Sequence, residues 1–275
     1  MLGALLILSG CAGFITPPKL KNEVLVVSNI QYYEGPGASP QMHALDLYIP
    51  KSGHKFPVVI FVHGGAWTFG DKGNLANVGY GLAEKGYLAV LVNYRLSPAV
   101  QHPAHITDIA RAVSWTFRNI RRYGGDPDLI FLGGHSAGAH LVSLLALDEK
   151  YLYEQNFPLA KIKGIICISG LYKLDLTRKY DSIFTSNPKE RQDASPISHL
   201  TKRPPPFLIL YAAREMPMLD EQAEDFAARI HELGGAADLK QIPETNHQTI
   251  ISWFGHNNDQ TSLAVFRFLE EILRE

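Results

Sequence analysis

Short apolar runs alternate with amphipathic stretches along most of this 275-residue chain. The short runs are dense in Val, Ile and Leu, as strands buried on both faces of a sheet are. The predicted strands are Val24–Ile30, Ala44–Ile49, Pro57–Val62, Leu88–Asn93, Leu129–Leu132, Ile165–Ser169, Phe207–Tyr211 and Leu239–Ile242. The predicted helices are Ile106–Ile120, Ala137–Leu147, Leu219–Leu233 and Ser262–Leu273. Because strands and helices alternate, we expect an α/β fold with a mostly parallel central sheet, helices on both faces and an antiparallel opening pair.

The length and composition fit one large domain. With 46% apolar and 19% charged residues, the chain can bury a sizeable core. We expect a single α/β domain over residues 24–275. Within it, residues 171–204 contain several prolines and no clear strand pattern. We expect this segment to leave the sheet and form one wall of a pocket.

The N-terminal segment differs from the rest of the chain. It is apolar, too short to span a bilayer as a helix, and ends in Leu-Ser-Gly-Cys at Cys11. Residues 1–11 resemble a bacterial lipoprotein signal, in which Cys11 would receive the lipid, and residues 12–23 would then be a tether. A signal peptide should open with positive charge, whereas the first basic residue here is Lys19. Small residues nevertheless occupy the required positions beside the cysteine, so we expect a lipoprotein of the bacterial cell envelope with membrane attachment through Cys11. The alternative is a cytoplasmic protein with a buried or frayed N-terminus.

Charge and cysteine content argue against several classes of function. The formal net charge of −1 at pH 7 gives no sign of a nucleic-acid partner. Besides Cys11, the chain has only Cys167, in a predicted buried strand where a thiol behaves as a small hydrophobic group. No Cys/His cluster has zinc-site spacing, and His135 and His140 lack the H-E-x-x-H pattern. We expect neither a metal nor a cofactor.

The strongest chemical motif is Gly134-His135-Ser136-Ala137-Gly138, between a predicted strand and a predicted helix. In this context G-x-S-x-G forms a sharp turn that pushes the serine hydroxyl clear of the backbone. The turn crowds the residues two before and two after the serine, and glycine has no Cβ to clash there. The following helix directs its first N–H groups toward the same place. Ser136 is therefore the candidate nucleophile.

A second glycine-containing segment, His63-Gly64-Gly65-Ala66-Trp67, follows the predicted strand Pro57–Val62. Open α/β sheets bind ligands at the carboxyl ends of their strands, and glycines allow backbone N–H groups to approach a substrate oxygen closely. The candidate oxyanion donors are the backbone N–H groups of Gly64, Gly65, Ala66 and Ala137. The candidates for substrate contact are Trp67 and His135.

Four segments taken together are similar to the α/β-hydrolase superfamily. They are His63–Trp67, Asn-Tyr-Arg-Leu-Ser-Pro at 93–98, Gly-Gly-Asp-Pro at 124–127 and Gly-His-Ser-Ala-Gly-Ala-His at 134–140. The chain resembles the carboxylesterase branch, which includes hormone-sensitive-lipase-like esterases, feruloyl-esterase-like proteins and kynurenine formamidases. The likeness extends over roughly residues 40–273. It implies the α/β-hydrolase fold, a glycine loop as oxyanion hole, and the chain order nucleophile, acid, base.

The order implied by this resemblance places the base late in the chain. His247 follows the last predicted strand, in a loop at the expected edge of the sheet. It is preferred as the general base because this position fits. The other histidines after Ser136 are His199, His231 and His256.

The acid is predicted at the turn after Phe207–Tyr211, where the family usually has Asp. This chain has Glu215 there, seven residues before Gln222. A glutamate can orient and charge-stabilise an imidazole as an aspartate does. Asp220 is the alternative acid, although capping and the helix dipole also explain an Asp in a first helical turn.

Together these residues predict a serine hydrolase that cleaves a small-molecule carboxylic ester through an acyl-enzyme. Ser136 would be the nucleophile, His247 the base and Glu215 the acid. The same triad serves an arylformamidase or a small peptidase, so both stay open as alternatives. A non-catalytic binding protein is disfavoured because a binding module has no need of all three residues.

Overall fold

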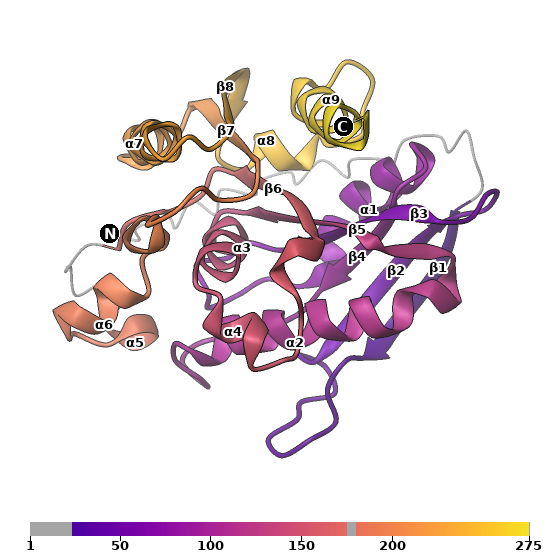
Figure 1. The fold of residues 1–275 in the computed structure, drawn as a ribbon, viewed down its shortest axis with the longest axis horizontal. Helices are drawn as coiled ribbons and strands as arrows, with labels where there is room; N and C mark the ends of the chain where they lie inside the picture. Colours follow the sequence, from indigo (N-terminus) through magenta and orange to yellow (C-terminus); the bar gives the residue numbers. More distant parts are fainter. Residues whose placement is uncertain (1–23, 175–179, 275) are drawn as a thin grey trace, which may run out of the picture.

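The computed structural model describes residues 24–174 and 180–274, so Cys11 and the predicted signal and tether segments lie outside the described residues. One eight-stranded sheet forms the centre of the described chain (Figure 1). Its strands are β1 (Val24–Gln31), β2 (Ala44–Pro50), β3 (Phe56–Val62), β4 (Leu88–Val92), β5 (Gly125–His135), β6 (Ile162–Ile168), β7 (Phe207–Arg214) and β8 (Ala237–Asn246).

The strands lie in the order β1-β2-β4-β3-β5-β6-β7-β8. β2 is antiparallel to both β1 and β4, whereas every other pair of neighbours is parallel. Parallel neighbours end at the same edge of a sheet, so the carboxyl ends of β3, β5, β6, β7 and β8 lie along one edge. This topology confirms the predicted α/β-hydrolase fold with an antiparallel opening pair.

Helices cover both faces of this sheet (Figure 1). α2 (Ala104–Asn119), α3 (Ala137–Leu147) and α7 (Leu219–Glu232) pack on one face. α1 (Ala76–Glu84) and α9 (Gln260–Arg274) pack on the other. The short helices are α4 (Lys150–Tyr153), α5 (Asp181–Phe184), α6 (Pro188–Asp193) and α8 (Thr249–Ser252), with 3₁₀ turns at Lys72–Leu75, Ile120–Tyr123, Leu159–Lys161 and Pro196–His199. None of the helices described is long and apolar enough to cross a membrane.

The side chains of β3 show how the sheet divides the core. Val58, Ile60 and Val62 pack against the α2 and α3 face, whereas Val59 and Phe61 pack against the α1 and α9 face. Successive side chains of a strand point to opposite faces, so a strand covered on both sides must be apolar at every position. Full burial of a side chain of this size contributes roughly 1.5–3 kcal/mol. The continuous apolar run therefore specifies a central strand.

The hydrophobic pattern does not predict α1, and its composition explains why. Gly79 and Gly81 lie inside this helix, and an interior glycine costs about 1 kcal/mol relative to alanine. Val78 and Leu82 are fully buried against the sheet, so tertiary packing stabilises a helix of low intrinsic propensity. β5 also begins earlier than predicted because Gly125 pairs with a residue of β3.

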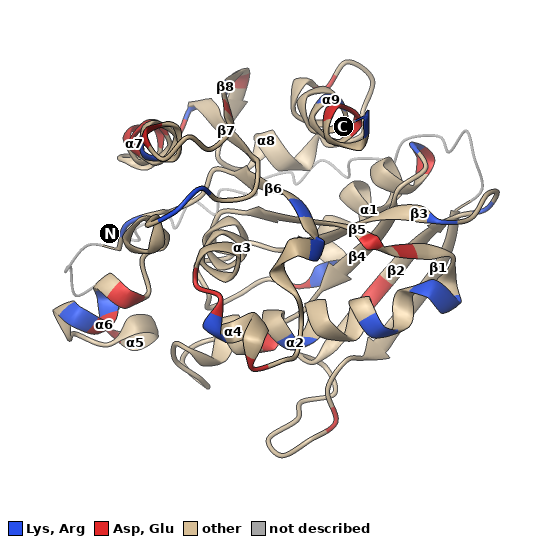
Figure 2. Ribbon diagram, in the orientation of Figure 1, with Lys and Arg blue, Asp and Glu red and all other residues tan. Residues whose placement is uncertain are grey.

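Figure 2 shows both basic and acidic residues along the ribbons of α6, α7 and α9. The charged residues of α7 and α9 are exposed. Asp108 of α2 is a buried exception: its carboxylate accepts hydrogen bonds from Arg95 Nε and Nη2, both at 2.8 Å, and lies 3.0 Å from Nε2 of His43. Burial raises the pKa of Asp108, but the bonds from His43 and Arg95 outweigh it and lower that pKa. Asp108 therefore anchors α2 to the segment that follows β4.

Candidate active site

Ser136 lies on the sharp turn that joins β5 to α3. Its φ of 53° and ψ of −118° fall outside the regions favoured by L-residues, a strain of roughly 1–3 kcal/mol. A Cβ on Gly134 would lie 2.4 Å from the backbone carbon of Gly138, and a Cβ on Gly138 would lie 2.1 Å from the carbonyl oxygen of Val62. Both glycines are therefore required: Gly134 because the turn closes tightly on its own backbone, and Gly138 because the turn is pressed against the end of β3.

Three side chains from the ends of three strands form one series of hydrogen bonds. Nε2 of His247 lies 3.0 Å from Oγ of Ser136, and Nδ1 of His247 lies 2.7 Å from Oε1 of Glu215. Ser136 directly follows β5, Glu215 follows β7 and His247 follows β8. The structure thus brings together the three residues selected from the sequence. In this arrangement Nε2 can accept the serine proton while Nδ1–H donates to the carboxylate.

The carboxylate of Glu215 accepts four hydrogen bonds, and its side chain is only 2% exposed. Besides His247, the donors are Oγ of Ser169 at 2.5 Å, the N–H of Ala212 at 3.1 Å and the N–H of Met216 at 2.8 Å. Burial raises the pKa of this carboxyl, but these bonds, above all those from His247 and Ser169, outweigh it and lower the pKa to about 2. Glu215 is therefore ionised at neutral pH.

The sequence patterns did not single out Ser169 as a site residue. It follows β6 directly, is 1% exposed and has a φ of 50°. The one sequence signal that could have pointed to Ser169 was its place as a polar residue at the carboxyl end of a predicted strand.

Asp220, the alternative acid, is exposed on the first turn of α7 and makes no hydrogen bond with His247 among the contacts of the described chain. The structure therefore places Glu215, and not Asp220, against His247.

The loop after β3 is left-handed at three successive residues, with φ values of 115° at Gly65, 48° at Ala66 and 58° at Trp67. Gly65 is required because a Cβ there would lie 2.0 Å from the carbonyl oxygen of Phe69. Within residues 24–174 and 180–274, the N–H groups of Gly65, Ala66 and Ala137 donate to no backbone acceptor. The loop lies beside the nucleophile, since a Cβ on Gly64 would be 3.1 Å from Cβ of Ser136. These N–H groups can therefore serve a substrate oxygen.

Neighbouring side chains hold this loop in place. Nδ1 of His63 donates to the carbonyl oxygen of Gly64 at 2.7 Å, and the ring stacks on Tyr94 with centroids 4.5 Å apart. Burial lowers the pKa of His63, which keeps the ring neutral. Further along, Asp71 caps the 3₁₀ turn Lys72–Leu75 and accepts a hydrogen bond from Nδ2 of Asn93 at 2.7 Å. The loop is thereby tied to the end of β4.

A cavity of about 580 Å³ opens at Ser136, a volume typical of small-molecule sites. Its apolar lining includes Trp67, Leu171, Tyr180, Met216, Leu219 and Ile251. None of the described residues that line it is Asp, Glu, Lys or Arg. Leu171 and Tyr180 belong to the predicted excursion at 171–204, so this segment contributes to the wall. The division of the chain into signal, tether and domain stays a prediction.

Both predicted substrate contacts line this cavity, and both are almost fully buried. Trp67 is 1% exposed. Its ring packs edge to face, at centroid distances of 5.0, 6.0 and 4.8 Å, on His140, Tyr180 and Phe184. Nε2 of His135 lies 2.8 Å from the backbone oxygen of His247. This N–H of His135 therefore already has a partner within the protein. Contact of Trp67 and His135 with a substrate stays a prediction.

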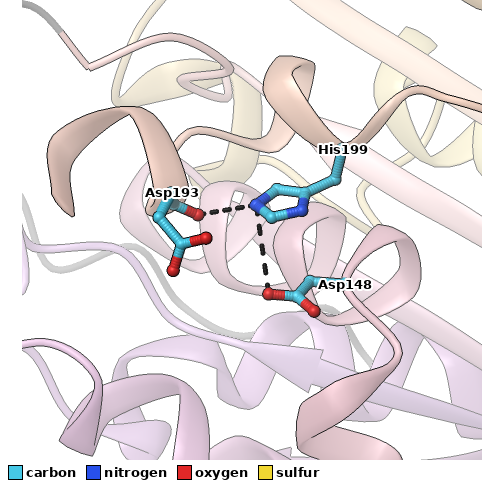
Figure 3. Close-up of side chains that lie close together, drawn as sticks. All are labelled: Asp148, Asp193 and His199. Carbon is cyan, nitrogen blue, oxygen red and sulfur yellow. Dashed lines mark hydrogen bonds and ion pairs between the residues drawn. The ribbon is translucent and has the colours of Figure 1, made fainter. Parts of the chain in front are cut away.

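Away from the cavity, Asp148, Asp193 and His199 form the group of possible metal ligands found in the described residues (Figure 3). Lys150 occupies it, with Nζ 2.7 Å from Oδ2 of Asp148 and 3.0 Å from Oδ2 of Asp193. Nε2 of His199 donates to the backbone oxygen of Asp193 at 2.6 Å. Because the ammonium group supplies the positive charge, this group is an ion-pair cluster. His199 belongs to it and not to the Ser136 site.

The BD-FAE family model matches residues 45–230, more than half of the chain. The chain belongs to this family. Curated relatives include the probable carboxylic ester hydrolase LipM of Mycobacterium tuberculosis, 32% identical over 78% of this chain and 54% of LipM. The isoprenylcysteine alpha-carbonyl methylesterase ICME of Arabidopsis thaliana is 29% identical over 71% of this chain and 51% of its own length. The chain thus spans about half the length of the curated relatives it matches.

Solved esterase structures share this fold. Esterase B from Lactobacillus rhamnosis gives a TM-score of 0.80 at 20% identity, covering 94% of this chain and 89% of that one. A truncated carbohydrate esterase from gut microbiota gives a TM-score of 0.79 at 19% identity, covering 94% of this chain and 99% of that one. At this level of identity the likeness concerns the fold, and it confirms the α/β-hydrolase architecture.

Replacement of Glu215 by Gln should remove a pH-dependent part of the stability. The folded pKa of about 2 lies below the ordinary value of 4.5. Ionised Glu215 therefore stabilises the fold above about pH 4.5, and this contribution is lost as the pH falls toward 2. A shift of that size corresponds to about 3 kcal/mol at neutral pH. Denaturant unfolding at several pH values should show this loss in the wild type and in Asp220→Asn, but not in Glu215→Gln. Equal acid sensitivity of all three proteins would contradict the assigned bonds.

Proposed function

We propose that this protein hydrolyses carboxylic esters through a covalent acyl-enzyme, with Ser136, His247 and Glu215 as catalytic residues. The observation that carries the proposal is the hydrogen-bonded series of these side chains, at 3.0 and 2.7 Å, beside a cavity of about 580 Å³. Two relatives support it by name, since LipM is named a probable carboxylic ester hydrolase and ICME a methylesterase.

In the proposed first step, Oγ of Ser136 attacks the ester carbonyl while Nε2 of His247 takes its proton. A tetrahedral intermediate forms, and its collapse breaks the bond to the alcohol. The imidazolium of His247 protonates the departing alkoxide, which leaves an acyl group on Ser136. Water then attacks this acyl group by the same route, and the carboxylic acid is released with the serine restored.

The negative charge that develops on the carbonyl oxygen needs donors that are already oriented. The N–H groups of Gly65, Ala66 and Ala137 supply them, with Gly64 as a further candidate. Gly65 and Ala66 lie in a loop with a left-handed backbone conformation, and Ala137 is at the N-terminus of α3. Glu215 completes the mechanism, because its ionised carboxylate orients His247 and stabilises the imidazolium.

The electrostatics of the cavity favour an uncharged ester over the two alternative substrates. N-formylkynurenine carries a carboxylate and an ammonium group, and aminoacyl substrates of a small peptidase carry an ammonium group. The described lining offers no Lys or Arg to pair with a substrate carboxylate, and no Asp or Glu to pair with a substrate ammonium group. Its apolar side chains instead suit a modest uncharged acyl or alcohol group.

The N-terminal segment supports a second proposal, that Cys11 carries a lipid and holds the enzyme at the bacterial cell envelope. The support is the apolar run that ends in Leu-Ser-Gly-Cys. The segment from 12 to 23 would then separate the hydrolase domain from the membrane.

Ser136→Ala should lower turnover of p-nitrophenyl acetate by about 10⁴-fold or more, because the attacking atom is gone. The wild type should react with a fluorophosphonate at Ser136, and it should hydrolyse the acetate ester far faster than N-formylkynurenine or an aminoacyl anilide. Substantial turnover by Ser136→Ala would exclude the mechanism. A wild type that is neither labelled nor active would point to the binding-protein alternative.

Glu215→Gln and Asp220→Asn should differ sharply in kcat. Loss of the carboxylate beside His247 should lower kcat by about 10⁴-fold, as expected when the imidazole loses its orienting acid. Asp220→Asn lies on an exposed helical turn and should stay within about twofold of the wild type. Steady-state kinetics of both variants on one ester measures this difference in kcat. A larger loss of kcat in Asp220→Asn than in Glu215→Gln would make Asp220 the acid.

Cys11→Ser should release the protein from the membrane fraction of a bacterium that expresses the full chain. In the wild type, a clickable fatty acid fed to the cells should label the protein, because lipid attached at Cys11 is expected to anchor it. Comparable labelling of Cys11→Ser, or a wild type found only in the soluble fraction, would refute attachment at this residue.

A further inference from the structure

His135 contacts parts of the site that come from separate elements. It is the last residue of β5 and directly precedes Ser136. Its Nε2 lies 2.8 Å from the backbone oxygen of His247, in the loop after β8. Its Nδ1 would lie 3.0 Å from a Cβ built on Gly64, in the loop after β3. One buried imidazole therefore stands between the nucleophile, the base and the oxyanion loop.

The protonation state of His135 follows from its partner. A carbonyl oxygen can only accept a hydrogen bond, so Nε2 carries the proton and Nδ1 has the lone pair. Burial, and next the charge of His247, lower the pKa of His135 to about 4, against the opposing effects of the backbone bond and of Glu215. The rings of His135 and His247 lie 4.9 Å apart. A neutral His135 thus places no charge beside the imidazolium that forms on His247 in the proposed reaction.

The loop that carries His247 is otherwise stiffened mainly from within. Oδ1 of Asn246 accepts from the N–H groups of Gln248 and Thr249, both at 2.9 Å. The N–H of Asn246 donates to Oγ1 of Thr249, also at 2.9 Å. These bonds shape the turn but do not join it to the nucleophile strand. The bond from His135 connects the backbone of His247 itself to β5.

We propose that His135 is a positioning residue, whose N–H holds the backbone of His247 so that the imidazole reaches Ser136 and Glu215 at the same time. The inference rests on the proposed function and goes beyond it, because His135 touches no reacting atom. A misplacement of about 1 Å can cost about 10²-fold in rate, so one backbone tether can matter as much as a direct contact.

Three variants separate positioning from simple stability. His135→Leu removes the donor at similar volume, whereas the side-chain amide of His135→Gln can reach the same carbonyl. His140→Leu is the matched control: His140 is fully buried, and its Nε2 donates to the backbone oxygen of Ala194 at 2.8 Å. The control thus loses the same kind of bond without contact with the His247 loop.

Two measurements on the intact protein test the proposal. For a neutral ester, His135→Leu should lower kcat by about 10- to 100-fold with little change in KM, whereas His140→Leu should stay within about threefold. In proton NMR, the low-field resonance of the Nδ1–H that His247 donates to Glu215 should broaden or vanish in His135→Leu. His135→Gln should restore most of the kcat and most of the resonance intensity. The resonance is assigned to His247 by its absence from the spectrum of His247→Ala.

The outcomes distinguish this inference from the proposed function. An unchanged resonance and kcat in His135→Leu, or equal losses in His140→Leu, would overturn the positioning role. If the wild type shows the resonance but hydrolyses no ester, the proposed function fails. In that case the response of the resonance to His135→Leu still decides the inference, because this measurement needs no substrate.

Discussion

The tight turn at Ser136 is the constraint on which the rest of the site depends. It forces the serine backbone to a φ of 53°, and it leaves no room for a Cβ at Gly134 or Gly138. Its strain of roughly 1–3 kcal/mol is sustained by the strands on either side. β5 pairs with both β3 and β6, and the N–H of Ser136 donates to the carbonyl oxygen of Ile168 at 2.8 Å.

The parallel sheet then brings the other groups to the same edge. The glycine loop at His63–Trp67 follows β3, and Ser136, Ser169, Glu215 and His247 follow β5, β6, β7 and β8. These five strands are neighbours in that order. Adjacent strands are only about 4.8 Å apart, so side chains from successive strand ends can meet. Two groups at this edge differ in charge: Glu215 is ionised, whereas burial keeps His135 neutral. An imidazolium on His247 would therefore have one counter-ion and no competing cation at His135.

The hydrophobic pattern predicts the central strands well because both faces of these strands are covered, which makes their apolar runs continuous. β3 and β4 are the clearest cases. The pattern fails at α1, where Gly79 and Gly81 lower the helix propensity and packing against the sheet overrides it. It also misses the first residues of β5, whose strand character depends on pairing with Phe56 and not on their own side chains.

By itself the sequence determined the fold class and selected Ser136 and His247 as candidates for nucleophile and base. A glycine-flanked serine between strand and helix is a local pattern, and the chain order implied by the resemblance points to a histidine after the last strand. Only the tertiary structure placed Glu215, and not Asp220, against His247, brought Ser169 to Glu215 and gave His135 its partner. The physical reason is that these choices depend on which side-chain atoms meet across the sheet edge. Ser169 lies 46 residues from Glu215, and His135 lies 112 residues from His247. Hydrogen bonds between such distant residues are set by strand order and register, which no local pattern encodes.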